Sequence, residues 1–417
     1  MITGRGLTEG YLNNDEIETI LSAGLDTLAL DGKRVLIIIP DRTRTMPLPF
    51  LFSLFDDLLS TRARYLDYLV ALGTHQPLND SQLSRLVGRE VQYGRVGKIR
   101  ISNHEWHKPE TFAHLGTLPA EEIKKASGGR LTEAVPISVN KLVLGYDQVI
   151  ICGPVFPHEV AGFSGGYKYI IPGIAGPEII NFTHWLGALI TNFKTIGKID
   201  TPVRVVIDRA AELIPTKMAF CGLVGDHKGV SGLYFGEVRE AWRAAAGLSG
   251  QRHIIYKDKP FRRVISCMPA MYDDLWTAAK GMYKVEPVVA DGGEVIIYAP
   301  HIHEVSYTHG KLLEEIGYHC RDYYLAQWDK FKGYPGGVLA HSTHLKGLGE
   351  YDPSTQVEKP RIKVTLATGI SAERCQRINL GYMDPKEIKI NEWQDREDEG
   401  ILVVPKAGET LYQLKAS

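Results

Sequence analysis

Residues 153–185 read GPVFPHEVAGFSGGYKYIIPGIAGPEIINFTHW, and this segment combines a glycine-rich loop with one lysine and two histidines. The apolar run YDQVIICGPV leads into it and predicts a buried strand that ends near Cys152 or Gly153. Glycines permit a tight turn or a close backbone approach to a ligand, and three fall in the loop: Gly162, Gly165 and Gly166. The following GPEIINFTHW predicts a helix that accepts Pro177 in its first turn.

Lys168 stands between two imidazoles, with His158 on the entry side of the loop and His184 about two turns into the following helix. A phosphate-binding P-loop requires glycine directly before its lysine and Ser or Thr directly after it. Here Tyr167 and Tyr169 flank Lys168, and GFSGGY lacks the GxGxxG spacing of a dinucleotide site. The pattern therefore favours a loop that presents Lys168 itself.

Segments typical of strands and helices alternate along the rest of the chain. KRVLIIIP, LDYLVALG and KIRISN predict buried strands, and MPLPFLFSLFDDLLS and NDSQLSRLVG between them predict helices. Such alternation is typical of an α/β fold with a mainly parallel sheet and helices on both faces. The pattern breaks at QRHIIYKDKPFRR and then resumes. We therefore predict two Rossmann-like domains, residues 1–258 and 259–417, with an active-site cleft between them.

Charged and imidazole side chains follow several of the predicted strands. Asp41 and Arg44 come after the first strand, His75 after the second, and His158 after the strand that precedes the glycine-rich loop. Ligands of parallel sheets collect beyond the carboxyl ends of the strands, so we expect these residues to converge on one crevice. A simpler alternative makes Asp41 and Arg44 a helix cap with a surface ion pair, and His75 a turn residue.

The composition describes an ordinary globular protein, in which 44% of the 417 residues are hydrophobic and 23% are charged. A formal net charge of -1 gives no reason to expect nucleic acid or an anionic membrane as a partner. No apolar run is long enough to span a bilayer, and the first residues lack the apolar region of a signal peptide. Five cysteines without CxxC spacing favour reduced thiols over disulfides. We therefore predict a cytoplasmic protein.

The run HEVAGFSGGYKYIIPGIA, followed by a histidine sixteen residues after the lysine (184 minus 168), closely resembles the lactate racemase family. Scattered motifs extend this resemblance over most of the chain. Enzymes of that family use a nickel-pincer nucleotide, pyridinium-3,5-bisthiocarboxylic acid mononucleotide nickel, tethered to a lysine. The resemblance implies that this cofactor is covalently attached to Lys168 beside Gly165 and Gly166, and that His184 is the protein ligand to nickel.

The resemblance also implies which side chains handle protons and substrate. His75 and His158 would be the two catalytic histidines, because either hand of a substrate must place its hydroxyl near a base, and imidazole titrates near working pH. Arg44 would bind the substrate carboxylate through its planar guanidinium. Asp41 would orient His75 or Arg44.

The implied reaction inverts C2 of a 2-hydroxy acid. A base takes the hydroxyl proton while hydride passes to the cofactor, and the flat 2-oxo acid then receives hydride on its other face. Lys280 matches a family lysine that contacts the substrate, whereas Thr277 stands where the lactate enzymes carry glutamine. This departure leaves lactate, another short or aromatic 2-hydroxy acid, and a sugar acid such as gluconate open as substrates. Enzymes that synthesise the cofactor would be transient partners.

Other interpretations have weaker support in the sequence. A dissociable-cofactor or zinc-dependent oxidoreductase or hydrolase would lack its usual GxGxxG or HExxH motif. A non-catalytic hydroxyacid-binding protein would not need two acid/base histidines. Six more histidines form pairs without a zinc-binding context, and we interpret them as structural or pocket-lining: His104, His107, His301, His303, His341 and His344.

Overall fold

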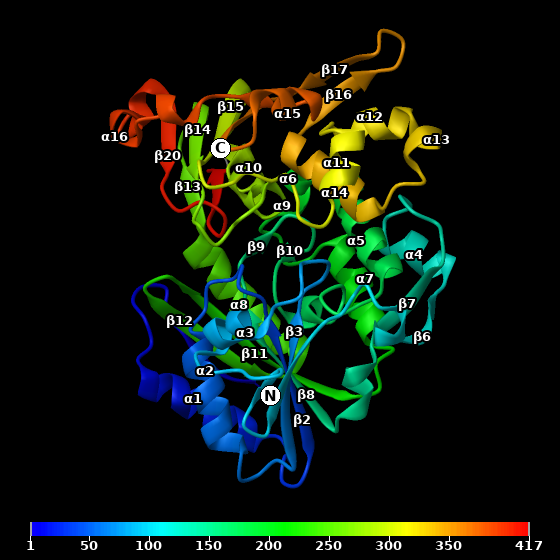
Figure 1. The fold of residues 1–417 in the computed structure, drawn as a ribbon, viewed down its shortest axis with the longest axis vertical. Helices are drawn as coiled ribbons and strands as arrows, with labels where there is room; N and C mark the ends of the chain where they lie inside the picture. Colours follow the sequence, from blue (N-terminus) through cyan, green and yellow to red (C-terminus); the bar gives the residue numbers. More distant parts are fainter. Residues whose placement is uncertain (1, 416–417) are drawn as a thin grey trace. The chain divides into compact units, whose positions relative to one another are not determined.

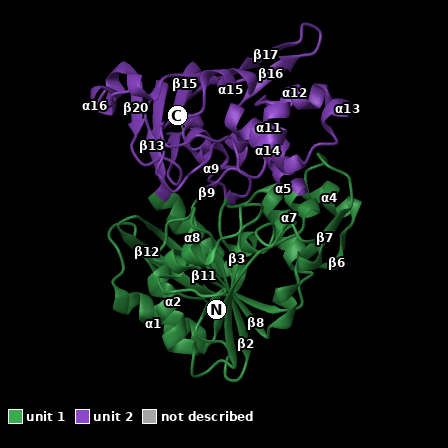
Figure 2. Cartoon of the chain, in the orientation of Figure 1, with its two compact units in different colours: residues 1–156, 163–180, 199–252 green, residues 157–162, 181–198, 253–417 purple. Residues whose placement is uncertain are grey.

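The computed structural model describes residues 2–415 and divides into two compact α/β units (Figure 1, Figure 2). Unit 1 comprises the chain up to residue 156 with 163–180 and 199–252, and unit 2 comprises 157–162, 181–198 and the chain from 253 onward. The predicted α/β class with mainly parallel sheets is confirmed. The two Rossmann-like domains with a boundary at residue 258, and the cleft between them, stay predictions.

An eight-stranded sheet organises unit 1 in the order β1-β12-β11-β8-β2-β3-β5-β4. Its central strands are parallel: β11 (Lys217–Asp226), β8 (Gln148–Pro154), β2 (Arg34–Pro40), β3 (Tyr65–Ala71) and β5 (Ile99–Asn103). Both edges are antiparallel and consist of β1 (Ile2–Gly6), β12 (Gly229–Gly236) and β4 (Arg95–Val96). Because the central strands share one direction, the residues that follow them emerge at one edge of the sheet.

Strand β2 lies inside this sheet, where it is buried on both faces. Residues 35–39 are at most 1% exposed, which accounts for their uninterrupted apolar sequence. The helices that share this core are α1 (Asn14–Asp26), α2 (Leu48–Leu59) and α3 (Asp80–Val87). Asn13 and Asn79 cap α1 and α3 through reciprocal capping boxes. The strands and helices predicted for this part of the chain are confirmed.

Two parts of unit 1 were not predicted from the sequence. Strand β1 has the sequence ITGRG, which has no apolar alternation, and pairs only along one edge. An antiparallel pair forms a small sheet of its own, β6 (Phe112–Leu118) with β7 (Val135–Asn140), and α4 (Ala120–Ala126) lies between them in sequence.

Unit 2 contains a parallel sheet in the order β19-β18-β15-β14-β20. Its strands are β19 (Gly381–Tyr382), β18 (Lys363–Thr368), β15 (Val289–Ala299), β14 (Phe261–Cys267) and β20 (Ile401–Val404). The α/β alternation predicted to resume after QRHIIYKDKPFRR is therefore confirmed. Asp274 caps a short helix, α9 (Leu275–Ala278), and a second short helix, α10 (Lys280–Tyr283), follows after Ala279.

The remaining helices are α5 (Pro177–Ile190), α6 (Asn192–Thr195), α7 (Pro202–Ala211), α8 (Val238–His253), α11 (Gly310–Ile316), α12 (Arg321–Ala326), α13 (Trp328–Phe331), α14 (Gly336–Lys346), α15 (Ala372–Arg377) and α16 (Ile390–Trp393). The remaining strands are β9 (Pro157–His158), β10 (Gly162–Phe163), β13 (Ile254–Lys257), β16 (Gly349–Asp352), β17 (Val357–Pro360) and β21 (Leu411–Leu414). Across residues 2–415, no helix has the length and apolar character needed to cross a membrane.

Candidate functional site

The carboxyl ends of β2 and β3 bring Asp41 and His75 into contact. The two strands are parallel, with Pro40 opposite Ala71, so Asp41 and the turn that carries His75 emerge side by side. The Asp41 carboxylate is bonded to Nδ1 of the His75 ring. Asp41 is 5% exposed, whereas the His75 side chain is 27% exposed. The expectation that these strand ends converge therefore holds for this pair.

Asp41 is held in its ionised form. Burial alone would raise its pKa, but the His75 ring, the Arg44 guanidinium and a Thr43 hydrogen bond together hold the pKa well below its usual range. Thr43 donates from its backbone N (2.9 Å) and from Oγ1 (2.7 Å) to the Asp41 carboxylate. Because an ionised carboxylate only accepts, His75 Nδ1 carries the hydrogen, and Nε2 keeps a lone pair that can accept a proton.

Arg44 extends this cluster through Thr43. Its guanidinium donates to Thr43 Oγ1 at 2.7 Å and to the Thr43 carbonyl at 3.1 Å, and its central carbon lies 5.6 Å from the centre of the Phe156 ring. Asp41 thus touches His75 directly and Arg44 by way of the Thr43 hydroxyl. An imidazole and a guanidinium thus lie within one cluster of unit 1, an arrangement that can accept a proton and bind an anionic group.

The glycine-rich loop has the sharp backbone turn and close packing that its glycines predicted. Gly165 and Gly166 have φ values of +83° and +61°, which favour glycine, and both are buried. A Cβ on Gly165 would lie 2.6 Å from Val155 Cγ2, and one on Gly166 would lie 2.9 Å from Trp242 Cγ. Lys168 follows in a short 3-10 turn, Gly166–Tyr169, and is half-buried.

In unit 2, His158 ends strand β9 and is 6% exposed. Its Nδ1 accepts a hydrogen bond from the backbone N–H of Val160 at 3.1 Å. A neutral ring with Nδ1 as acceptor carries its hydrogen on Nε2, the opposite tautomer from His75. Glu159 Oε2 lies 3.3 Å from the same Nδ1.

His184 lies two turns into α5, as predicted, and shares its surroundings with two histidines of α14. Burial lowers the pKa of His341 well below its ordinary value, and neighbouring His344, His309, His184 and Lys280 lower it further. Burial lowers the pKa of His344 to about 4, against the opposing effect of Glu159. His341 and His344 are three residues apart on one helix and therefore share a face. That spacing indicates a shared face, but nothing in the sequence indicates that the face lies beside His184.

The two predicted substrate residues of unit 2 have different environments. Lys280 is 8% exposed, with Nζ 4.4 Å from the centre of the Tyr272 ring. Thr277 is also buried, but its Oγ1 bonds to Asp274 Oδ1 at 2.8 Å as part of the cap of α9. Trp276, which the sequence patterns did not single out, stacks on the His341 ring with centres 4.1 Å apart.

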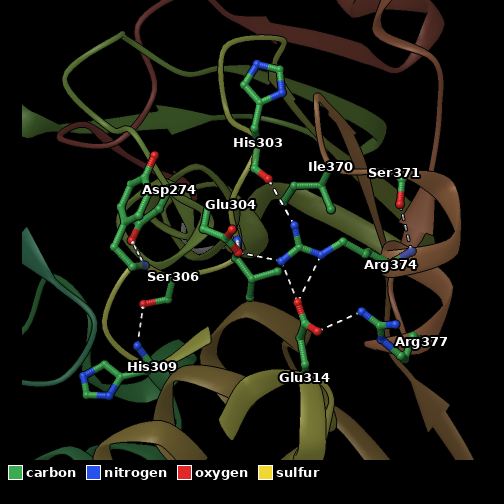
Figure 3. A network of polar contacts seen from close by, with 12 residues as sticks. Asp274, His303, Glu304, Ser306, His309, Glu314, Ile370, Ser371, Arg374 and Arg377 are labelled. Carbon is green, nitrogen blue, oxygen red and sulfur yellow. Dashed lines mark hydrogen bonds and ion pairs between the residues drawn. The ribbon is translucent and has the colours of Figure 1, made fainter. Parts of the chain in front are cut away.

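A loop with three further histidines is anchored by Arg374 of α15 (Figure 3). Arg374 donates to the carboxylates of Glu304 and Glu314 and to the His303 carbonyl. The loop ends at His309, whose ring centre lies 4.5 Å from that of Trp276. Within residues 2–415, no group of three or more His, Cys, Asp or Glu side chains is arranged to hold a metal ion by itself.

A family model described as the lactate racemase N-terminal domain matches residues 14–197. Among curated relatives, lactate racemases from Thermoanaerobacterium thermosaccharolyticum and Lactiplantibacillus plantarum are 25% and 24% identical over 280 and 293 residues. Residues 14–197 are therefore similar to the N-terminal domain of lactate racemases, the name that both curated relatives carry. Each alignment covers 66% of this chain and 62% of the relative, which is less than two thirds of the relative's length.

Solved structures extend the likeness to almost the whole chain. A crystal structure of a Thermotoga maritima protein is 35% identical, with a TM-score of 0.90 over 98% of this chain and all of that one. The lactate racemase apoprotein of T. thermosaccharolyticum has the same fold, with a TM-score of 0.69 and 19% identity over 95% of this chain and 92% of its own. The lactate racemase N-terminal match spans the residues singled out in the first half of the chain: Asp41, Arg44, His75, His158, Lys168 and His184.

Proposed function

We propose that this chain is a 2-hydroxyacid racemase or epimerase of the lactate racemase family. The observation that carries the proposal is the buried, ionised Asp41 bonded to His75 Nδ1. That bond fixes the ring so that Nε2 is free of its hydrogen and able to accept one. Arg44, linked to the same carboxylate through Thr43, would bind the carboxylate of a 2-hydroxy acid.

The two proposed catalytic histidines start from complementary states. His75 presents an acceptor nitrogen, whereas neutral His158 carries its hydrogen on Nε2. One neutral ring would take the hydroxyl proton of the substrate, while the other, first protonated to imidazolium, would return a proton on the opposite face; the reverse reaction would exchange their roles. Lys280, buried over Tyr272, would contact the substrate.

The residues fit the nickel-pincer nucleotide that the family resemblance implies. Lys168 supplies an amine for a covalent tether, and the space behind Gly165 and Gly166 is too narrow for any side chain. His184 supplies an imidazole, a suitable nickel ligand, among histidines whose pKa values burial keeps low. When bound, the nucleotide would supply an acceptor for the C2 hydride, leaving proton transfer and substrate orientation to the protein.

The substrate class is a small 2-hydroxy acid, and its identity is left to experiment. Thr277 occupies the position of the family glutamine, and its hydroxyl is already bonded to Asp274. A side chain engaged in a helix cap is poorly placed to bond a substrate. We therefore propose testing lactate beside a longer 2-hydroxy acid, an aromatic one and gluconate.

The test is to produce the chain together with the cofactor-synthesis enzymes and measure its intact mass and its racemisation of pure enantiomers. We expect a cofactor-sized mass increase at Lys168, interconversion of a 2-hydroxy acid, and retention of deuterium from C2-labelled substrate. Lys168→Ala should abolish both the mass increase and the activity. Rapid loss of the label to water, or full activity in Lys168→Ala, would contradict the proposal.

A further inference from the structure

Three consecutive carbonyl groups of the glycine-rich loop receive hydrogen bonds from two side chains of unit 1. Arg204 of α7 donates to the carbonyls of Phe163 and Gly165, the latter at 3.2 Å. Trp242 of α8 donates from Nε1 to the carbonyl between them, that of Ser164, at 2.8 Å. The loop is therefore held at every peptide from residue 163 to residue 165, just before the turn that carries Lys168.

The two donors also hold each other. The guanidinium carbon of Arg204 lies 4.0 Å from the centre of the Trp242 ring, within the range of a cation–π contact. Arg204 is 4% exposed, and burial lowers its pKa to about 10, while nearby Asp208 acts in the opposite direction. The described hydrogen bonds of this buried guanidinium go to loop carbonyls. Burying a charged group costs desolvation free energy that an apolar side chain would not cost, so packing alone does not explain an arginine at this position.

The loop sequence is adapted to this arrangement. A Cβ on Gly166 would lie within 2.9 to 3.1 Å of three Trp242 side-chain atoms, so the indole can approach only a glycine. Ser164 fixes the other side of the loop, donating from Oγ to the Pro154 carbonyl at 3.1 Å and accepting from the Phe156 N–H at 3.0 Å. The loop is thus tied both to the end of β8 and to the pair on α7 and α8.

We infer that Arg204 and Trp242 are positioning residues that hold the glycine-rich loop in the geometry needed to load and retain a cofactor on Lys168. This inference rests on the proposed function, since Lys168 must be the tether for its position to matter in this way. The two side chains act through backbone carbonyls, and their role is to limit the number of conformations that Lys168 can adopt.

Two conservative variants isolate the contacts. Trp242→Phe keeps an aromatic ring for Arg204 but removes the N–H that bonds to Ser164. Arg204→Lys keeps a positive charge but loses the planar fork that reaches two carbonyls. Arg209→Met is the matched control, since Arg209 lies on the same helix but pairs with Glu122 and Glu212 at the surface.

Each variant would be produced with the cofactor-synthesis enzymes and examined by intact mass, hydrogen exchange over residues 163–169 and urea unfolding. We expect exchange in the loop to quicken by about tenfold in both conservative variants, as expected for the loss of a hydrogen bond. The loaded fraction should fall with it, whereas Arg209→Met should match the wild type. Urea midpoints will identify any variant that loses its global fold. If Arg204→Lys does not fold, Trp242→Phe alone tests the positioning role.

The outcomes separate this inference from the proposed function. If the wild type is loaded and both conservative variants exchange and load like it, the positioning role is wrong and the tether proposal stands. If the wild type gains no mass at Lys168, the tether proposal fails. Unchanged hydrogen exchange in the two variants would then overturn the positioning role as well.

Discussion

Two histidines follow neighbouring strands of the unit 1 sheet, yet they lie in opposite environments. His75 follows β3, is partly exposed, and has an ionised carboxylate on Nδ1. His104 follows β5, the adjacent strand, is fully buried, and accepts a hydrogen bond on Nδ1 from the Asn140 amide at 3.2 Å. Burial lowers the pKa of His104 to about 4. A strand end therefore sets only the position of an imidazole, and burial together with the hydrogen-bond partner determines whether the ring can act as a base.

Removing the proposed base should have the largest effect. His75→Ala is expected to lower turnover by about 10²–10⁴-fold, the usual contribution of a general base. Both enantiomers should be affected equally, because a catalyst cannot shift their equilibrium. Initial rates in both directions, followed by chiral chromatography, provide the measurement. His114→Ala, an exposed histidine of β6, is the control. A loss below about twofold for His75→Ala would remove it from the mechanism.

Replacing the partner of the base should cost less. Asp41→Asn keeps the shape but allows the amide to donate, so His75 Nδ1 is no longer forced to carry the hydrogen, and we expect turnover to fall by about 10²-fold. The same variant has a pH signature in stability. The pKa of Asp41 is lowered in the folded chain, so its contribution is complete above its unfolded pKa of about 3.9 and is lost as pH falls below that value.

Urea unfolding tests this second part. The difference in unfolding free energy between wild type and Asp41→Asn should be largest near neutral pH and should shrink below about pH 4. A difference that stays constant down to the acid limit would mean that Asp41 is not held ionised by His75 and Arg44.

The sequence predicted the half of the site that depends on strand ends. KRVLIIIP and LDYLVALG are continuous apolar runs, and parallel pairing of two such strands brings Asp41 and His75 together without further information. The order of the strands was beyond prediction, because β8 pairs with β2 and β11 through contacts far apart in the chain. The same strand-end argument would have placed His104 beside His75, since nothing local reveals that Asn140 is its partner.

Unit 2 was harder to predict for a related reason. His341 and His344 belong to GGVLAHSTHL, a segment without helical amphipathicity, since nearly every residue of α14 is buried. Their proximity to His184 arises between helices α5 and α14, whose nearest ends are 146 residues apart in the chain (336 minus 190). The family resemblance singled out His184, sixteen residues after Lys168, as a proposed nickel ligand, whereas the two α14 histidines were interpreted as structural or pocket-lining.

Arg44 tests whether geometry or charge matters at the substrate end of the unit 1 cluster. Arg44→Lys keeps the charge but replaces a planar fork by a single ammonium, so the substrate carboxylate loses a bidentate partner. We expect kcat/KM to fall by about tenfold, mostly through KM, as for the loss of one charge-assisted hydrogen bond. Arg42→Lys, two residues earlier, is the control. If Arg44→Lys and Arg42→Lys have the same kcat/KM, Arg44 contributes charge alone.

His104 should have the smallest effect on turnover and the clearest effect on acid stability. Its pKa is lowered to about 4 in the folded chain, whereas an unfolded histidine has a pKa of about 6.5. Between these values the unfolded chain binds a proton that the folded chain refuses, so stability is lost as pH falls from about 6.5 to 4. The loss from this one residue amounts to about 3 kcal/mol, a large part of a typical domain's stability.

His104→Gln removes the titrating ring while keeping a polar acceptor for Asn140. Urea unfolding between pH 7 and pH 4 should therefore show a smaller loss of stability in the variant than in the wild type, with the two curves converging as pH falls. Turnover at neutral pH should change by less than about twofold, because the ring is buried and neutral there and takes no part in proton transfer. A turnover loss as large as that of His75→Ala would mean that both strand-end histidines serve the reaction. The claim that only His75 can act as a base would then be wrong.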